Sequence, residues 1–258
     1  MAQSNSNLIP SKDYLKIISW NVKGLNQAIK SKRVFSHFQH LRVGIAFLQE
    51  THLQKRDQTK IHRELVGQLF HSQFNSKGRG VAILIHKNIP FVVSDTILDP
   101  NGRYVIVVGQ LFQLSLVLVN IYGPNFDYEN IFKKLFSCIP SLDSHHLIMA
   151  GDYNLVINSV LDRSSESVHR PSKSLHTVQS FIDTHKLIDP WRFEYPIKRE
   201  YSYYPNVHKS FSRIDFFLVD PYLLSDIIEC EDDTIIISDH APVSIKMTLP
   251  TQRTKRTW

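Results

Sequence analysis

The chain has 258 residues, a hydrophobic content of 42% and a formal net charge of +6 at pH 7. These values exclude a largely disordered chain and suit one α/β domain or two small ones. The basic balance indicates an anionic partner such as nucleic acid. Two cysteines are too few for a disulfide scaffold and favour a reducing compartment. No apolar run approaches the about 18 residues of a membrane span, and the polar N-terminus lacks a signal-peptide core, so we expect neither membrane insertion nor secretion.

Short apolar segments bounded by Gly, Pro or polar residues recur along the chain, as is typical of buried strands. In chain order they predict strands at 16–22, 43–49, 81–86, 91–97, 104–111, 114–122, 147–150 and 214–219, with the last strands inside 234–249. Apolar residues at helical spacing predict helices at 29–41, 127–139 and 172–187. Asp127 is a suitable N-cap for the second helix. Residues 54–70 have a weaker pattern of a helix followed by a strand.

These elements indicate one α/β unit, because no internal repeat and no linker rich in Gly or Ser divides the chain. Strands far outnumber helices, and several form hairpins, for example beyond the Asn101-Gly102 turn signal. This pattern favours a four-layer α/β sandwich, in which two packed, mostly antiparallel β-sheets are flanked by helices. We expect a disordered N-terminal lead over residues 1–12, one folded domain over 13–250, and a basic tail over 251–258 that leads toward the remainder of a longer protein.

Several predicted strands end in side chains that can bind metals or move protons. The stretch Leu147–Val156 is the clearest case, because an apolar run stops at Gly151 and is followed by Asp152 and Asn154. A glycine there allows either a sharp turn or the close approach of another group. Other apolar runs lead to polar or aromatic residues of the same kind, namely Asn21, Glu50, Tyr122, Asp239 and His240. If these ends share one edge of the fold, they form a catalytic cluster; taken singly, each is also an ordinary turn or surface residue.

The residue types favour metal-assisted acid–base chemistry. A carboxylate such as Glu50 at a rigid strand end suits Mg²⁺, whereas zinc is disfavoured because no His/Cys ligand spacing occurs. Asp152 and Asn154 lie two residues apart, so on an extended chain both would face one side. One could then activate a water while the other holds an oxygen. His240 beside Asp239 would have a raised pKa and could face a phosphate as a cation, although most of the thirteen histidines must be structural.

Six short motifs follow one another along the chain: Ile18-Ser-Trp-Asn21, Phe47-Leu-Gln-Glu-Thr-His52, Tyr122-Gly-Pro-Asn125, Gly151-Asp-Tyr-Asn154, Ser212-Arg-Ile-Asp215 and Ser238-Asp-His240. They occur in the order seen in the endonuclease/exonuclease/phosphatase superfamily, which includes abasic-site endonucleases, and the chain resembles that superfamily over about residues 16–249. Three further segments resemble, more narrowly, the N-terminal endonuclease of LINE non-LTR retrotransposons: Lys77–Leu84, Leu187–Arg192 and Glu200–Asp215. The resemblance implies a deoxyribonuclease-like fold.

The resemblance also implies roles for individual residues. Glu50 would bind the divalent metal, with Asn21 beside it and Asp239 nearby; the metal would be Mg²⁺, for which Mn²⁺ can substitute. Asp152 would orient or deprotonate the attacking water, and Asn154 would hold the phosphate.

Further roles concern the phosphate and the DNA. Tyr122 and Asn125 would contact the phosphate, and His240, oriented by Asp215, would stabilise its pentavalent state. DNA contacts would involve Ser202, which resembles a hydroxyl position on a DNA-binding hairpin, and the basic side chains His208, Lys209 and Arg213. Lys23 stands where close relatives often carry a polar amide, which weakens the expectation of a DNA contact at that position.

Similarity to LINE endonucleases implies that the chain cleaves DNA. The chain would be a Mg²⁺-dependent endonuclease that nicks one strand of double-stranded DNA at T-run/A junctions and leaves a 3′-hydroxyl and a 5′-phosphate. The 3′-hydroxyl would prime a reverse transcriptase domain that follows in the same polyprotein. Action would be in the nucleus, with the ribonucleoprotein in the cytoplasm. We interpret residues 201–211 as a β-hairpin that reads the minor groove, whose chemical code is degenerate.

Three alternatives use the same residues. An abasic-site repair endonuclease would need only different loops. A phosphatase for a phosphoinositide or another small molecule would not need the basic residues near the predicted hairpin, among them Lys198 and Arg199. A catalytically inactive binding module is disfavoured by the complete set of Glu50, Asp152, Asp215 and His240.

Overall fold

The structure is a computed structural model, and it describes residues 14–54, 57, 61, 65–75, 77–165, 172–205, 210–232 and 237–249. The expected lead over 1–12 and the tail over 251–258 therefore lie outside the described residues. One sheet has six strands in the order β10 (Ile227–Asp232), β11 (Val243–Thr248), β1 (Tyr14–Asn21), β2 (Ile45–Gln49), β4 (Val81–His86) and β3 (Val66–Ser72). The second sheet has the order β5 (Phe91–Leu98), β6 (Tyr104–Leu111), β7 (Leu114–Tyr122), β8 (His146–Asp152) and β9 (Asp215–Val219).

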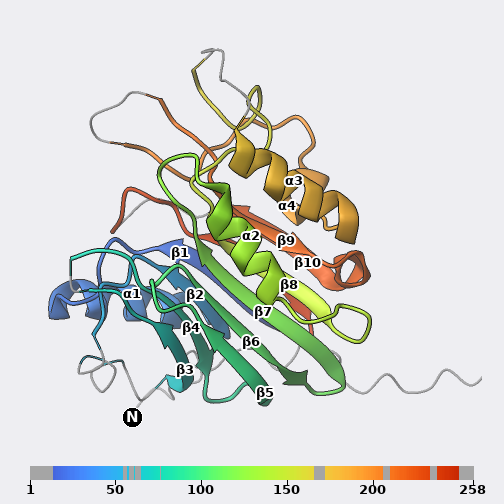
Figure 1. The fold of residues 1–258 in the computed structure, drawn as a ribbon. Coiled ribbons are helices and arrows are strands. Elements are labelled where there is room, and N and C mark those ends of the chain that lie inside the picture. The colour runs from blue at the N-terminus through green and yellow to red at the C-terminus, as the bar shows by residue number, and fades with distance from the viewer. Residues whose placement is uncertain are drawn as a thin grey trace, which may run out of the picture.

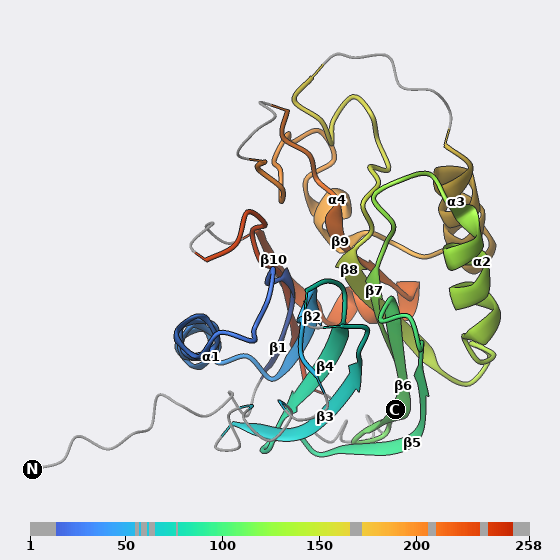
Figure 2. The same cartoon turned by 60° about the vertical axis from the view of Figure 1, so that its left-hand side comes forward.

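The two sheets pack face to face, and helices cover their outer faces (Figures 1 and 2). Helix α1 (Ala28–Leu41) lies on the first sheet, while α2 (Glu129–Cys138) and α3 (Lys173–His185) lie on the second. Two short elements, α4 (Pro190–Glu194) and the 3₁₀ helix η3 (Pro221–Asp226), flank β9. Among the described pairings, β1–β2 and β7–β8 are parallel and the others are antiparallel. The predicted four-layer sandwich is therefore confirmed.

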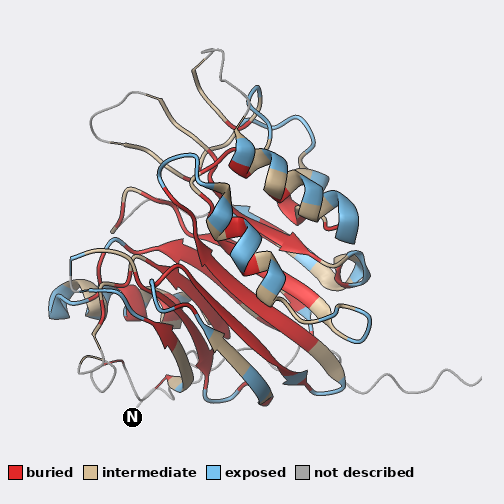
Figure 3. Ribbon diagram, viewed as in Figure 1, coloured by how far each residue is buried: buried red, intermediate tan, exposed pale blue. Residues whose placement is uncertain are grey.

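Alternation along each strand explains the layers. In β7, Leu116 and Leu118 enter the core between the sheets, whereas Val117 and Val119 pack under α2 and α3. Successive side chains of a strand point to opposite faces, so a strand covered on both sides is apolar throughout. Figure 3 shows the central strands buried along most of their length. Each such side chain contributes about 1.5–3 kcal/mol when fully buried. No helix in the described residues is long and apolar enough to cross a membrane.

Two details of the sequence prediction are wrong. Asp127 does not cap α2; its carboxylate accepts hydrogen bonds from the backbone nitrogens of Lys173 and Ser174, at the start of α3. The region 234–249 does not form continuous strand, because residues 237–242 are irregular before β11, and β10 lies upstream of the predicted range. The other predicted strands and helices match described elements within a few residues, except that the helix pattern at the start of 54–70 lies mostly outside the described residues.

Candidate active site

The ends of four core strands meet at one edge of the two sheets. Strands β1 and β2 run parallel, and they end beside each other at Asn21 and just before Glu50. In the other sheet, β7 and β8 run parallel and pair Tyr122 with Asp152, while the antiparallel β9 places Asp215 opposite Asp152. The carboxyl ends of parallel strands lie at the same edge, so these side chains are brought together although they are distant in the sequence.

Glu50 is held at this edge by neighbouring side chains. Asn21 Nδ2 donates to Glu50 Oε1 over 3.1 Å, and the Tyr122 hydroxyl donates to the same oxygen over 2.7 Å. His52 Nε2 lies 3.6 Å from the other oxygen. Burial raises the pKa of Glu50, but the neighbouring His52 ring and the hydrogen bonds from Tyr122 and Asn21 outweigh burial and lower the pKa to about 2. Glu50 is therefore ionised near neutral pH, and 22% of its side chain is open to solvent.

Asp152 is buried and accepts a hydrogen bond at each carboxylate oxygen. The backbone nitrogen of Asn154 donates to Oδ1 over 2.9 Å, and Asn21 Nδ2 donates to Oδ2 over 2.9 Å. Burial, and then the negative charge of Asp215, raise the pKa of Asp152 to about 7. A carboxylate that titrates near neutral pH suits a group that accepts a proton from water.

His240 lies between two carboxylates. Its Nδ1 is 2.8 Å from Asp215 Oδ2, and its Nε2 is 3.8 Å from Asp152 Oδ2. Burial lowers the pKa of His240, but the charges of Asp215 and Asp152 outweigh it and raise the pKa to about 9. The site therefore contains a buried imidazolium at neutral pH, oriented by Asp215.

His240 lies in the loop before β11, which begins at Val243. Residues 234–236, where the sequence predicts the strand that leads to His240, lie outside the described residues. Because β11 runs antiparallel to β1, this loop reaches the edge where β1 ends. Trp20 Nε1 donates to the carbonyl oxygen of His240 over 3.0 Å and fixes the loop there.

Asn154 also reaches the site by a route that differs from the prediction. Strand β8 ends at Asp152, and Asn154 has a φ of 52°, so the two residues do not share a face of an extended chain. Asn154 Nδ2 donates to the carbonyl oxygen of Gly123 over 3.0 Å. Gly151 allows close approach, since a Cβ at that position would collide with the carbonyl oxygen of Ile121. Asn125, predicted to contact phosphate, is exposed in the segment after β7.

Some neighbours of the site were not assigned a catalytic role from the sequence. Lys23 Nζ binds Asp239 Oδ2 over 2.6 Å, so Asp239 is paired within the chain. The ring of Tyr203 lies 4.6 Å from the ring of His240, between centroids.

A buried contact between amide side chains joins the two sheets near the site, where Gln49 Nε2 of β2 donates to Asn120 Oδ1 of β7 over 2.8 Å. Two buried amides inside apolar strands are the sequence signal that could have identified this last contact.

The structure contradicts two of the predicted DNA contacts. Ser202 is buried, and its hydroxyl accepts hydrogen bonds from the backbone nitrogens of Ile214 and Asp215, so it positions the start of β9. Arg213 has only 2% of its side chain exposed, and its guanidinium forms a bidentate ion pair with Asp189 over 2.6 and 2.9 Å. Neither side chain is accessible to DNA. The predicted contacts His208 and Lys209 lie outside the described residues.

The donor set at the edge fits a divalent, oxygen-binding metal. Glu50 offers an ionised carboxylate that is partly open to solvent, and Asn21 contributes an amide beside it. One atom each of Asp152, Asp215 and His240 also lie within 4.8 Å of one another. In that cluster His240 Nδ1 already binds Asp215, so Glu50 is the better ligand. Carboxylate and amide oxygens suit Mg²⁺ rather than zinc.

Carboxylates, amides and an imidazolium thus meet at one edge of a two-sheet sandwich. The model of the Endonuclease/Exonuclease/phosphatase family matches residues 18–240 of the chain. The chain belongs to this family, as its motifs predicted.

Comparisons with individual proteins agree with this assignment. The chain is 27% identical over 244 residues to the Transposon TX1 uncharacterized 149 kDa protein of Xenopus laevis; the match covers 91% of this chain but only 18% of that protein. It is 26% identical to the exodeoxyribonuclease of Bacillus subtilis, covering 90% of this chain and 98% of the relative. Its fold is similar to the AP endonuclease LMAP from Leishmania major, with a TM-score of 0.72, 16% identity and 96% of each chain covered.

Proposed function

We propose that this chain is a Mg²⁺-dependent DNA endonuclease that nicks one strand of double-stranded DNA and leaves a 3′-hydroxyl and a 5′-phosphate. The observation that carries the proposal is the cluster of side chains at the sheet edge, where Asn21 Nδ2 donates to both Glu50 and Asp152, and His240 lies 3.8 Å from Asp152 and 2.8 Å from Asp215. Glu50 is ionised, Asp152 titrates near neutral pH, and His240 is a cation held by Asp215. Hydrolysis of a phosphodiester needs each of these states: a metal ligand, a proton acceptor and a cation for the phosphate.

The residues of the site have different roles in the hydrolysis of the phosphodiester. Asp152 orients the attacking water and accepts its proton. His240 Nε2 faces the reacting phosphate and stabilises the charge that builds on its oxygens. Asn154 and Asn125 hold the phosphate in place. Glu50, with Asn21, would hold Mg²⁺, which when bound polarises the phosphate and offsets charge on the leaving oxygen.

The biological role proposed is the first step of LINE retrotransposition. In this proposal the nick lies at a T-run/A junction, and its 3′-hydroxyl primes a reverse transcriptase domain in the same polyprotein. Support comes from the similarity to the transposon protein and from the LINE-like motifs. The chain spans 18% of the length of that protein, which leaves room for further domains there. The complex would act in the nucleus and travel as a ribonucleoprotein in the cytoplasm.

The direct test is cleavage of supercoiled plasmid in Mg²⁺, with nick positions mapped by sequencing. We expect wild-type protein to nick, and we expect Glu50→Gln and Asp152→Asn to lose nicking while keeping the wild-type thermal unfolding temperature. Mn²⁺ should restore nicking after EDTA treatment. Asp143→Asn, which changes an exposed carboxylate, is the matched control and should nick normally. Undiminished nicking by both site variants, or in EDTA, would contradict the proposal.

A second candidate, an abasic-site endonuclease, is favoured by the AP endonucleases among the similar folds. An oligonucleotide duplex with one abasic site, compared with the intact duplex, separates the two. Cleavage confined to the abasic duplex would replace the proposed function. Release of phosphate from a phosphoinositide, without DNA cleavage, would identify a phosphatase instead.

A further inference from the structure

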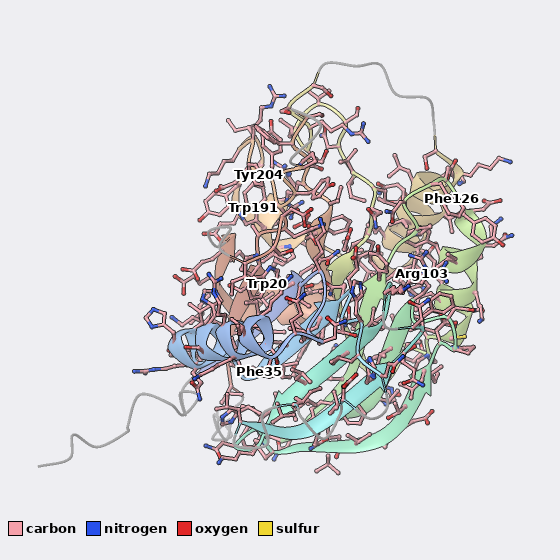
Figure 4. The ribbon with its side chains drawn as sticks, turned by 90° about the vertical axis from the view of Figure 1, so that its left-hand side faces the viewer. Trp20, Phe35, Arg103, Phe126, Trp191 and Tyr204 are labelled. Carbon is pink, nitrogen blue, oxygen red and sulfur yellow. The ribbon has the colours of Figure 1, made fainter. Side chains whose placement is uncertain are left out.

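A cavity of about 310 Å³ opens beside the active site, between the start of β6 and the loop that leads from β7 to α2. It is lined by cationic and aromatic side chains, including Arg79, Arg103, Phe126 and Tyr128. Figure 4 shows Arg103 and Phe126 on the same side of the molecule, with Phe126 beyond the end of β7. A volume of about 300 Å³ is at the lower end of the range for small-ligand sites, so the cavity suits a group of the size of one nucleotide.

The wall of the cavity is tied directly to the catalytic residues. Arg103 Nη1 donates to the carbonyl oxygens of Tyr122 and Gly123, over 3.3 and 2.8 Å. The Tyr122 hydroxyl binds Glu50, and the Gly123 carbonyl also accepts from Asn154. Two successive hydrogen bonds therefore connect Arg103, in the wall of the cavity, with Glu50 through Tyr122 and with Asn154 through Gly123.

The inner part of the cavity is lined by positively charged side chains, which suit an anion. Arg103 is 93% buried, and its Nε has no hydrogen-bond partner among the described residues. Arg79 and Arg103 line the same cavity, and burial, followed by the positive charge of Arg79, lowers the pKa of Arg103. Arg79 has a φ of 60° and stacks on Phe74 at 4.3 Å. The carboxylate of Asp99 also lines the cavity and binds Lys134 Nζ over 3.1 Å. Among the lining residues, three cations, Arg79, Arg103 and Lys134, face this one carboxylate, so the cavity keeps a positive charge.

The outer part of the cavity presents aromatic surface to solvent. Phe126 is 65% exposed and Tyr128 is 44% exposed, and their ring centroids are 5.9 Å apart at 38°. Rings that stay this exposed contribute little buried area to the fold, and a flat ring is a surface on which an unpaired base can stack. Phe126 directly follows Asn125, which is assigned to the phosphate.

We propose that this cavity binds one unpaired nucleotide of the DNA substrate, with its base stacked on Phe126 and Tyr128 and its phosphate facing Arg79 and Arg103. The inference rests on the proposed function and deepens it, because it names a locally unpaired strand as part of the substrate. A fully paired duplex presents its backbone but no free base face, so it would use the cations of the cavity without the aromatic rings. Bases are extruded most readily where pairing is already weak.

Binding without cleavage tests the inference. Wild-type protein in EDTA is titrated into a short DNA duplex that contains one unpaired 2-aminopurine nucleotide, and into the same duplex fully paired. We expect tighter binding of the bulged duplex and quenching of the 2-aminopurine fluorescence by stacking. The double variant Phe126→Ala, Tyr128→Ala should weaken binding of the bulged duplex by roughly 5- to 150-fold, the range for stacking of one base on aromatic residues, and the paired duplex much less.

Matched variants separate stacking from other effects. Phe126→Trp should retain the quenching, whereas Arg79→Gln should reduce the salt dependence of binding by about one phosphate contact. Phe112→Ala is the control: this residue is 48% exposed in the β6–β7 turn, at the opposite end of the sheet, and its loss should change neither signal.

Three results would overturn the inference. One is an equal loss of affinity for the bulged and paired duplexes in the double variant, another is unchanged quenching in that variant, and the third is tighter binding of an RNA duplex with the same bulge. Because these measurements need no metal and no turnover, their failure is distinct from failure of the proposed function. That function is tested separately by plasmid nicking with the same wild-type protein.

Discussion

His240 Nδ1 lies 2.8 Å from Asp215 Oδ2, and this bond joins the two halves of the sandwich. Asp215 begins β9 in the second sheet, whereas His240 precedes β11 in the first. Both side chains are buried, so water does not compete with the bond and the interaction between the charges is strong. The catalytic geometry therefore depends on the packing of the sheets against each other.

Removing the imidazole should remove transition-state stabilisation. We expect His240→Ala to lower the rate of single-turnover nicking by roughly 100- to 1000-fold, or about 2.7–4 kcal/mol, as for loss of one preorganised donor. Asp215→Asn should cost less, because an amide can still orient the ring but supplies no negative charge. His176→Ala, an exposed histidine on α3, serves as the control. Nicking by His240→Ala at the wild-type rate would show that the imidazolium has another role.

The pH profile of nicking should have two limbs. The pKa of Asp152 is raised to about 7, so its carboxylate is lost as pH falls through that value. The pKa of His240 is raised from 6.5 to about 9, so its cation is complete below about 6.5 in the unfolded and folded states and is lost as pH rises through about 9. Activity should therefore fall below about pH 7 and above about pH 9, with bound metal moving the acidic limb lower.

Variants assign the two limbs. In the His240→Ala variant the alkaline limb should disappear from the residual rate, since the imidazolium to which this limb is assigned has been removed. The interaction of His240⁺ with Asp215 also stabilises the fold, and this contribution should fade as pH rises toward about 9. Rates measured from pH 5.5 to 10 at constant ionic strength test both statements. An alkaline limb that persists in His240→Ala would assign it to another group.

The sequence predicted the fold where the signals were local. Strand and helix positions follow from the spacing of apolar residues, which is why α1 and β7 were located within a residue or two. The capping role of Asp127 could not be predicted, since its partners Lys173 and Ser174 lie 46 and 47 residues away and meet it only when α2 and α3 pack. The cap that Asp127 provides is a tertiary contact between two helices. The preference of Asp for helix starts predicts only a cap of the helix that follows it in the sequence.

In the candidate site, too, contacts between distant segments could not be predicted from the local sequence. Motif order named the side chains that meet at the edge of the sheets, because their chemistry is visible in the sequence. The sequence does not show which polar side chains are buried, because a hydroxyl or a guanidinium occurs both at DNA-binding surfaces and in protein interiors. Ser202 and Arg213 were therefore assigned to DNA although one supports the start of β9 and the other pairs with Asp189. The link between Lys23 and Asp239 joins segments 216 residues apart and has no local signal.

The ion pair between Arg213 and Asp189 should contribute to stability rather than to DNA binding. Arg213 also lies 4.7 Å over the ring of Trp191, so its charge is enclosed. We expect Asp189→Ala to lower the free energy of unfolding in urea by about 3–5 kcal/mol, because it leaves a buried guanidinium without its partner. Lys133→Ala, which breaks an exposed helical pair with Glu129 over 3.0 Å, is the control and should cost about 0.5 kcal/mol or less.

The segment between Tyr203 and Ser212 should determine where the enzyme cuts. Its base is fixed by two backbone hydrogen bonds between these residues, over 2.8 and 3.1 Å, and the Tyr203 ring contacts His240. The residues at the predicted hairpin tip, 206–209, lie outside the described residues. Since the minor groove distinguishes little more than A·T from G·C, selection there depends on groove width and deformability. T-run/A-run junctions combine a narrow groove with a flexible pyrimidine–purine step.

Replacing residues 205–209 by a tight turn should therefore scatter the nick positions on a plasmid while lowering total nicking much less, because Glu50, Asp152 and His240 stay in place. Sequencing the nicks made by both proteins on one plasmid measures this, and an identical nick pattern would show that the hairpin does not select the site.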